Sequence, residues 1–113
     1  MVDHIQIRKA QGTWVVRVAG AVVGETKKAL ELSEGSYPEV IYFPRADIAM
    51  AFLDPSEKTT HCPHKGDASY FNIVTKSGTL ENAVWSYEAP YEGVAEIAEH
   101  LAFGHEAVTV EKL

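Results

Sequence analysis

The chain has 113 residues, the size of one ordinary domain, so we expect a single domain over residues 1–113. Hydrophobic residues make up 46% of it and charged residues 23%, which excludes a disordered chain and a coiled coil. Ten basic residues against sixteen acidic ones give a net charge of −6. That balance predicts neither a nucleic acid nor a membrane as partner, because both select basic surfaces.

Most of the chain has the pattern of short strands. Ile5 and Ile7 alternate with polar residues, and similar alternation or β-branched runs recur between glycine-containing turn signals. We expect seven or eight strands, including a tight second hairpin near residues 19–24. The predicted strands cover residues 4–9, 14–18, 30–32, 40–43, 69–75, 79–87 and 107–110. Their short connections favour antiparallel pairing.

Two segments have the spacing of helices. Residues 46–53 follow Pro44 and are stopped by Pro55, which disfavours helical geometry in the residue before it. Residues 94–103 repeat apolar side chains at helical intervals, and Gly104 follows them. The predicted fold class is therefore mainly β, with two short helices packed on antiparallel sheets.

One cysteine, Cys62, occurs in the chain, so no disulfide can form within it. A lone thiol fits a reducing compartment. The first ten residues carry charges where a signal peptide needs an apolar core, and no stretch is apolar enough to span a membrane. We therefore expect a cytoplasmic protein.

The densest polar cluster covers residues 59–66, which we predict to be a loop. A cation beside a thiol stabilises the reactive thiolate, so Lys65, His61 or His64 could activate Cys62 as a nucleophile. The alternative is that Cys62 is a small buried core residue, since free cysteines are among the most buried residue types.

A metal site is the other interpretation of this cluster. His61, Cys62 and His64 offer three donors for zinc, and His100 or Glu99 could supply a fourth. Adjacent residues rarely bind one ion together, however, and paired CxxC ligands are absent from the sequence. We therefore predict neither a metal nor a cofactor.

Two further groups of residues could form a binding site. Arg45 follows a predicted buried strand and precedes a predicted helix, where a guanidinium and backbone N–H groups can hold an anion; the alternative is a surface ion pair with Asp47 or Glu81. Trp85 and Tyr87 share one face of a predicted strand. They could line a cleft or belong to an ordinary core.

The order of several motifs resembles the domain-of-unknown-function 427 family. Those motifs are Tyr42-Phe43-Pro44-Arg45, Thr60-x-Cys62-Pro63-x-Lys65-Gly66 with Ala68-x-Tyr70, Glu81-Asn82-x-x-Trp85-Ser86-Tyr87 and His100-Leu101-Ala102-Phe103. With Ala29-Leu30-x-Leu32 they span nearly the whole domain. The resemblance implies a β-tent-like fold, in which two antiparallel sheets meet at an angle with a pocket between them.

The resemblance implies no particular reaction. The family is sometimes labelled nucleotidyltransferase-like, but this sequence has no Asp-x-Asp pair to hold the magnesium ions that nucleotidyl transfer needs. The matching motif positions imply a set of pocket-lining residues, namely Arg45, Cys62, Lys65, Tyr70, Trp85, Tyr87 and His100. Two positions depart from the aromatic residues expected of the family, His64 and Gly104.

Three hypotheses about function follow. The first is a pocket between the sheets that binds a compact polar or anionic small molecule, with charge from Arg45 and Lys65 and walls of aromatic residues. The second is an enzyme with Cys62 as nucleophile or redox centre and His61, His64 or His100 as base. A disulfide cycle would need an external thiol because the chain has no second cysteine. The third is a protein-interaction module without a ligand, which predicts no pocket and an exposed apolar patch.

Overall fold

Strands dominate the fold seen in a computed structural model, which describes residues 4–113; the first three residues of the charged N-terminal stretch lie outside it. The prediction of a mainly β domain is confirmed. Within the described range the strands are, in order, β1 (Ile5–Lys9), β2 (Trp14–Val18), β3 (Ala21–Thr26), β4 (Leu30–Glu34), β5 (Val40–Tyr42), β6 (Leu53–Cys62), β7 (Gly66–Thr75), β8 (Gly78–Ser86), β9 (Ala102–Phe103) and β10 (Val108–Lys112).

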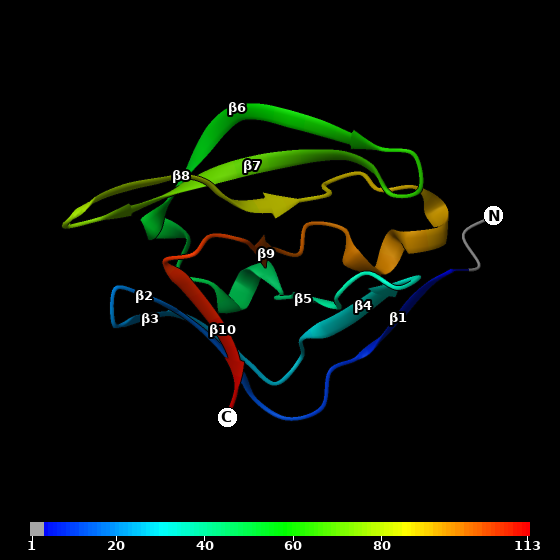
Figure 1. Ribbon diagram of the computed structural model, residues 1–113, viewed down its shortest axis with the longest axis horizontal. Helices are drawn as coiled ribbons and strands as arrows, with labels where there is room; N and C mark the ends of the chain where they lie inside the picture. The colour runs from blue at the N-terminus through cyan, green and yellow to red at the C-terminus, as the bar shows by residue number, and fades with distance from the viewer. Residues whose placement is uncertain (1–3) are drawn as a thin grey trace.

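Three antiparallel sheets make up the described part of the molecule, where two were expected. One has the order β6-β7-β8-β9, and its first three strands run across the top of Figure 1. The others, β1-β4-β5 and β10-β2-β3, occupy the lower right and the lower left. A backbone bridge between Phe43 and Leu101 ties the end of β5 to the segment before β9. The tent-like meeting of the sheets stays a prediction from the family resemblance.

The helix expected over residues 46–53 is wrong. Two short 3-10 turns, η1 (Arg45–Asp47) and η2 (Met50–Phe52), occupy this segment, and the backbone between them is extended at Ile48. Ile48 is buried and forms an antiparallel bridge with Gly24 of β3. Pairing with a distant strand therefore overrides the local helical spacing.

The helix expected over residues 94–103 is wrong for a related reason. A 3-10 element, η3 (Glu92–Ile97), takes up its first part and is kinked at Val94. Leu101, which had helical spacing, instead exchanges backbone hydrogen bonds with Phe43 at 2.8 and 2.9 Å. The residues after it form β9, which pairs with β8. Both Leu101 and Phe43 are buried, so the spacing of apolar residues in this segment reflects burial in the core and not a helix.

Most of the polar segment 59–66 is strand and not the predicted loop. β6 continues to Cys62 and β7 begins at Gly66, so residues 63–65 are all that remain as a tight turn. Pro55, expected to end a helix, lies in β6 as well. It pairs with Phe71 in an edge strand and directly precedes a shift in register, both of which are places where a sheet tolerates proline.

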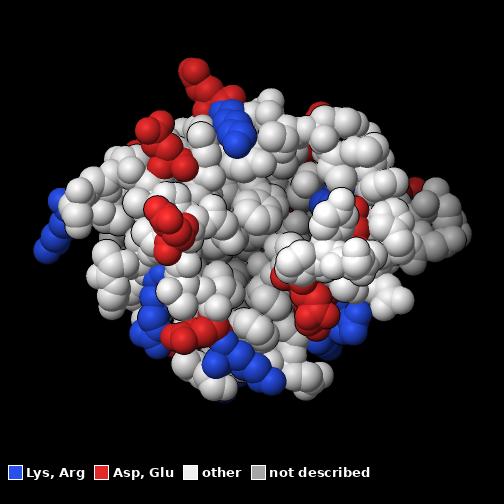
Figure 2. All heavy atoms as spheres, viewed as in Figure 1, with Lys and Arg blue, Asp and Glu red and all other residues white. Residues whose placement is uncertain are grey.

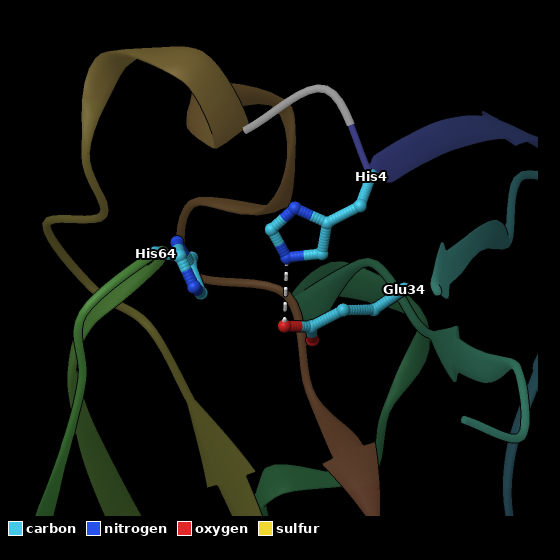
Figure 3. Close-up of side chains that lie close together, drawn as sticks. All are labelled: His4, Glu34 and His64. Atoms are coloured by element: carbon cyan, nitrogen blue, oxygen red, sulfur yellow. Dashed lines mark ion pairs between the residues drawn. The ribbon is translucent and has the colours of Figure 1, made fainter. Parts of the chain in front are cut away.

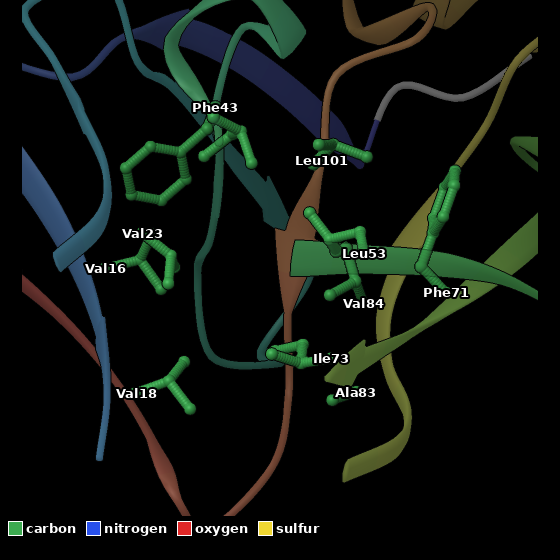
Figure 4. Close-up of a cluster of buried hydrophobic side chains, with 11 residues drawn as sticks. Val16, Val18, Val23, Phe43, Leu53, Phe71, Ile73, Ala83, Val84 and Leu101 are labelled. Atoms are coloured by element: carbon green, nitrogen blue, oxygen red, sulfur yellow. The ribbon is translucent and has the colours of Figure 1, made fainter. Parts of the chain in front are cut away.

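Two clusters of buried side chains form the core. The larger one packs the β2–β3 hairpin against the four-stranded sheet, as Figure 4 shows. Its buried members are Val16, Val18, Val23, Phe43, Ile48, Leu53, Phe71, Ile73, Ala83, Val84 and Leu101. The smaller cluster comprises Leu32, Tyr42, Ala68, Tyr87, Val94, Ile97 and Ala102. It lies under the largest group of candidate site residues and holds them in place.

The surface carries mixed charge. On the face seen in Figure 2, acidic and basic side chains alternate with uncharged surface and do not gather into one basic patch. No helical segment among residues 4–113 is long and apolar enough to cross a membrane.

Candidate functional site

A small pocket of about 240 Å³ opens between the β1-β4-β5 sheet and the four-stranded sheet. β4 and β5 supply one wall because side chains two apart on a strand share a face, as Leu32 and Glu34 do on β4. The turn at 63–65 and strands β7 and β8 supply the other. The lining residues are Leu32, Glu34, Tyr37, Pro38, Val40, Tyr42, Lys65, Tyr70, Trp85 and Tyr87.

Aromatic residues form half of the pocket lining. Tyr70 lies directly opposite Trp85 in the β7–β8 ladder, and the Trp85 indole N–H donates to the Tyr42 hydroxyl at 3.4 Å. Burial raises the pKa of both Tyr42 and Tyr87 above that of a free tyrosine. Both phenols therefore stay protonated at neutral pH and keep an O–H to donate.

An ion pair crosses the pocket floor. The Lys65 Nζ donates to the Glu34 Oε1 at 2.7 Å, and the two side chains are only 11% and 19% exposed. The hydrogen bond from Lys65 lowers the pKa of Glu34, while burial opposes this shift. Burial lowers the pKa of Lys65, but the Glu34 carboxylate and the neighbouring Cys62 thiol outweigh that effect and raise it. Both groups are consequently charged at neutral pH.

Glu34 also connects the pocket to two histidines at its rim. Its Oε2 lies 3.5 Å from the His4 Nε2, and the rings of His4 and His64 meet edge to face with centroids 4.6 Å apart. Figure 3 shows His4 directly before β1, Glu34 at the end of β4 and His64 in the β6–β7 turn, with both imidazole rings near the carboxylate. One ligand atom from each of the three residues lies within 4.8 Å of the others, so they could hold a metal ion.

The structure brings together four of the predicted site residues. Lys65, Tyr70, Trp85 and Tyr87 all line the pocket. Cys62 ends β6 beside them, half-buried and packed against the smaller core cluster, with its thiol close enough to influence the pKa of Lys65. The thiol is thus neither fully exposed nor fully buried.

Arg45 lies away from this pocket. Its guanidinium donates to the Glu99 carbonyl at 3.0 Å, to the buried Ser86 hydroxyl at 3.1 Å and to the Glu88 carboxylate at 2.9 Å. It also stacks over the Phe71 ring, 5.6 Å from its centroid. These contacts make Arg45 a structural tie between segments, and its carboxylate partner is neither of the two expected from the sequence.

The other predicted histidines have partners of their own. The exposed His61 ring contacts the Asp67 carboxylate at 2.7 Å across the β6–β7 ladder. The His100 Nδ1 lies 3.1 Å from the Ala98 carbonyl oxygen. The zinc set considered from the sequence, His61 with Cys62 and His64, is not the group that the structure gathers; His64 joins His4 and Glu34 instead.

Sequence reasoning missed His4 and Glu34 because they are far apart along the chain. Antiparallel pairing of β1 with β4 sets Ile5 opposite Glu34, which brings His4 beside that carboxylate. The signal available in the sequence was the alternation of Leu32 and Glu34, which places the acid on the same face as a core residue.

Gly104, one of the two departures from the family pattern, packs against Trp85. A Cβ at this position would lie 2.8 Å from the Trp85 Cζ3, so the glycine allows the indole ring its present place. Trp85 also lines a second pocket of about 340 Å³ that includes Trp14 and Phe103. The ring is therefore a partition between two pockets.

A larger groove lies at the far end of the sheets. It measures about 720 Å³, and its lining is mostly apolar, with Val18, Val23, Phe52, Ile73 and Val74 among its residues. Phe52 and Val74 are exposed. The interaction-module hypothesis predicts such an exposed apolar surface but also the absence of a pocket, so it stays a prediction.

Comparison with known proteins agrees with the motif pattern. No curated protein matches the chain. The profile of one family, described as Domain of unknown function (DUF427), matches residues 6–112, which is nearly the whole chain and includes every pocket-lining residue. The chain therefore belongs to the DUF427 family.

Proposed function

We propose that the pocket binds a compact polar small molecule rich in hydrogen-bond acceptors, such as a small carboxylate. The observation that carries the proposal is the excess of donors in a small space. The pocket is lined by the Lys65 ammonium and by the phenols of Tyr42, Tyr70 and Tyr87. Its one carboxylate, Glu34, is already paired with Lys65.

The charge balance supports an uncharged or singly negative ligand. An ammonium has three N–H donors, and the Glu34 carboxylate takes one of them from Lys65. The ammonium has further N–H donors beside this one, and the buried phenols of Tyr42 and Tyr87 keep an O–H to donate, whereas the Tyr70 hydroxyl is already hydrogen-bonded with Thr60 at 3.1 Å. A pocket of about 240 Å³ suits a ligand smaller than a drug-sized molecule, for which sites begin at about 300 Å³.

A thermal-shift screen of small carboxylates and carbonyl compounds, followed by calorimetric titration of each hit, tests this proposal. We expect a hit whose affinity falls at least tenfold in Lys65→Met. Lys76→Met is the matched control, because Lys76 lies in the β7–β8 turn and lines the distant groove instead. A screen without hits, or hits equally weakened by both variants, would overturn the proposal.

The Cys62 thiol beside Lys65 supports a second proposal, an enzyme that uses Cys62 as a nucleophile or, with an external thiol, as a redox centre. Alkylation of the native protein by iodoacetamide, followed by mass spectrometry, tests it. Modification blocked by the carboxylate hit would support a reactive thiol at the pocket. A thiol that reacts only in denaturant would eliminate the enzyme proposal.

The lone free thiol also supports the proposal of a cytoplasmic protein, since an unpaired half-buried cysteine is kept reduced there. Fractionation of cells that produce the protein without a tag, followed by immunoblotting, tests the location.

A further inference from the structure

We propose that His4, Glu34 and His64 form a binding site for a divalent transition-metal ion of the Zn²⁺ class at the rim of the pocket. Two imidazoles and one carboxylate are ligands that Zn²⁺ takes in proteins. The inference concerns the ion alone and does not rest on the small-molecule proposal.

The distances already approach those of a zinc site. Two ligand atoms each about 2.0–2.1 Å from a tetrahedral zinc ion lie about 3.4 Å from one another. The His4 Nε2 and the Glu34 Oε2 are 3.5 Å apart, so this pair has the required separation. The third ligand atom, from His64, lies within 4.8 Å of those of the other two residues, so its side chain must move closer to bind the same ion.

The ligands come from three backbone segments with fixed relative positions. Antiparallel pairing holds the start of β1 against the end of β4, in the register Ile5 to Glu34. The turn that carries His64 is pinned on both sides, because the Lys65 N–H donates to the Cys62 carbonyl at 3.2 Å and the Tyr91 N–H donates to the Lys65 carbonyl at 2.9 Å. The site is therefore supported by the fold and not by one mobile loop.

A second layer of contacts orients the carboxylate. Lys65 occupies the Glu34 Oε1, which leaves Oε2 directed at His4. Such outer contacts to a ligating group are common in metal sites and fix the orientation of the ligand. The buried ammonium also offsets the carboxylate charge, so we expect weaker binding than in closed zinc sites built from thiolates.

Three protein ligands leave one position of a tetrahedral ion open. Because Glu34 also lines the pocket, water or an acceptor atom of a molecule bound there could fill that position. The metal would thus supply a Lewis acid to a pocket whose other polar groups are mainly hydrogen-bond donors.

Calorimetric titration of the untagged full chain with Zn²⁺, together with Co²⁺ absorption spectra, tests the site at neutral pH. We expect one ion per chain and a tetrahedral Co²⁺ spectrum. His4→Ala, His64→Ala and Glu34→Gln should each weaken Zn²⁺ binding at least tenfold. The matched controls His61→Ala and His105→Ala should stay within twofold, since neither residue belongs to the cluster.

Zinc binding that is equally weak in the wild type and in His64→Ala, or that is lost in His61→Ala, would overturn the site. Circular dichroism of each variant checks that it folds. Two further measurements separate this inference from the small-molecule proposal. Trp85→Phe alters a pocket wall without touching a ligand and should keep Zn²⁺ affinity. Binding of a carboxylate hit is measured in excess chelator, where a failure concerns the pocket alone.

Discussion

Removing the Lys65 ammonium should lower the free energy of unfolding, and the size of the loss depends on how deeply the Lys65–Glu34 ion pair is buried. Lys65→Met keeps most of the aliphatic stem and leaves the Glu34 Oε1 without the donor now 2.7 Å away. Breaking a fully buried ion pair costs about 3–5 kcal/mol, whereas exposed pairs are worth about 0–1 kcal/mol. With side chains 11% and 19% exposed, this pair is nearer the buried case, but His4 still faces the other carboxylate oxygen. We therefore expect a loss of about 2 kcal/mol.

Urea unfolding at neutral pH of the wild type, Lys65→Met, Glu34→Gln and the double variant measures the interaction. The double variant should lose less stability than the sum of the single losses, by about 1–2 kcal/mol. The control is the surface pair of Arg17 and Glu111, which has a similar distance of 2.8 Å but side chains 39% and 45% exposed. Arg17→Met should cost less than about 1 kcal/mol. If Lys65→Met and Arg17→Met lost the same stability, burial would not determine the strength of these ion pairs.

The same cycle has a defined pH dependence. The pKa of Glu34 is lowered by folding, so its contribution is complete above the usual value of 4.5 and disappears as pH falls through the lower folded value. The pKa of Lys65 is raised, so its contribution is complete below 10.5 and disappears only as pH rises beyond that value. The coupling energy should therefore be level across neutral pH and shrink in acid. Coupling that grows in acid would contradict the assignment.

Three other substitutions test the remaining assignments. Arg45→Met removes a donor from the buried Ser86 hydroxyl and should cost about 1–3 kcal/mol in urea unfolding, while affinity for a pocket ligand stays unchanged; a selective loss of affinity would return Arg45 to the pocket. Gly104→Ala places a Cβ against the Trp85 ring and should shift the indole N–H resonance of that residue, whereas an unmoved resonance would contradict the packing. Leu101→Ala empties part of the larger core cluster and should cost about 2–5 kcal/mol; a loss below 1 kcal/mol would mean that Leu101 is not a core residue.

The fold class was predictable because its signal is local. Strands such as β2 and β7 carry alternating or β-branched residues that need no knowledge of the rest of the chain. The two expected helices failed where a buried side chain serves a distant pairing. Leu101 has helical spacing, but the backbone of Phe43 takes its hydrogen bonds. In a short segment, apolar residues at helical spacing look the same in the sequence as apolar residues that are buried by contacts with two separate sheets.

The candidate site was predictable only in part for the same reason. Lys65 and Trp85 fall in sequence motifs rich in polar or aromatic residues, and both line one pocket. Glu34 and His4 have no motif, because strand register alone brings them to the rim. Arg45 lies outside the lining of this pocket because its polar partners, among them Ser86, come from segments far along the chain.

The pairing of β10 with β2 ties an early strand to one near the other end of the sequence, with Val108 opposite Val18. During synthesis β2 leaves the ribosome long before β10. The edge of β2 that will pair with β10 therefore stays unpaired in the meantime, although most residues of β2 are buried in the final fold. Folds dominated by such distant pairings form in about milliseconds to seconds. The nascent chain thus exposes an unpaired strand edge until β10 has been synthesised, and chaperones can bind it during this interval.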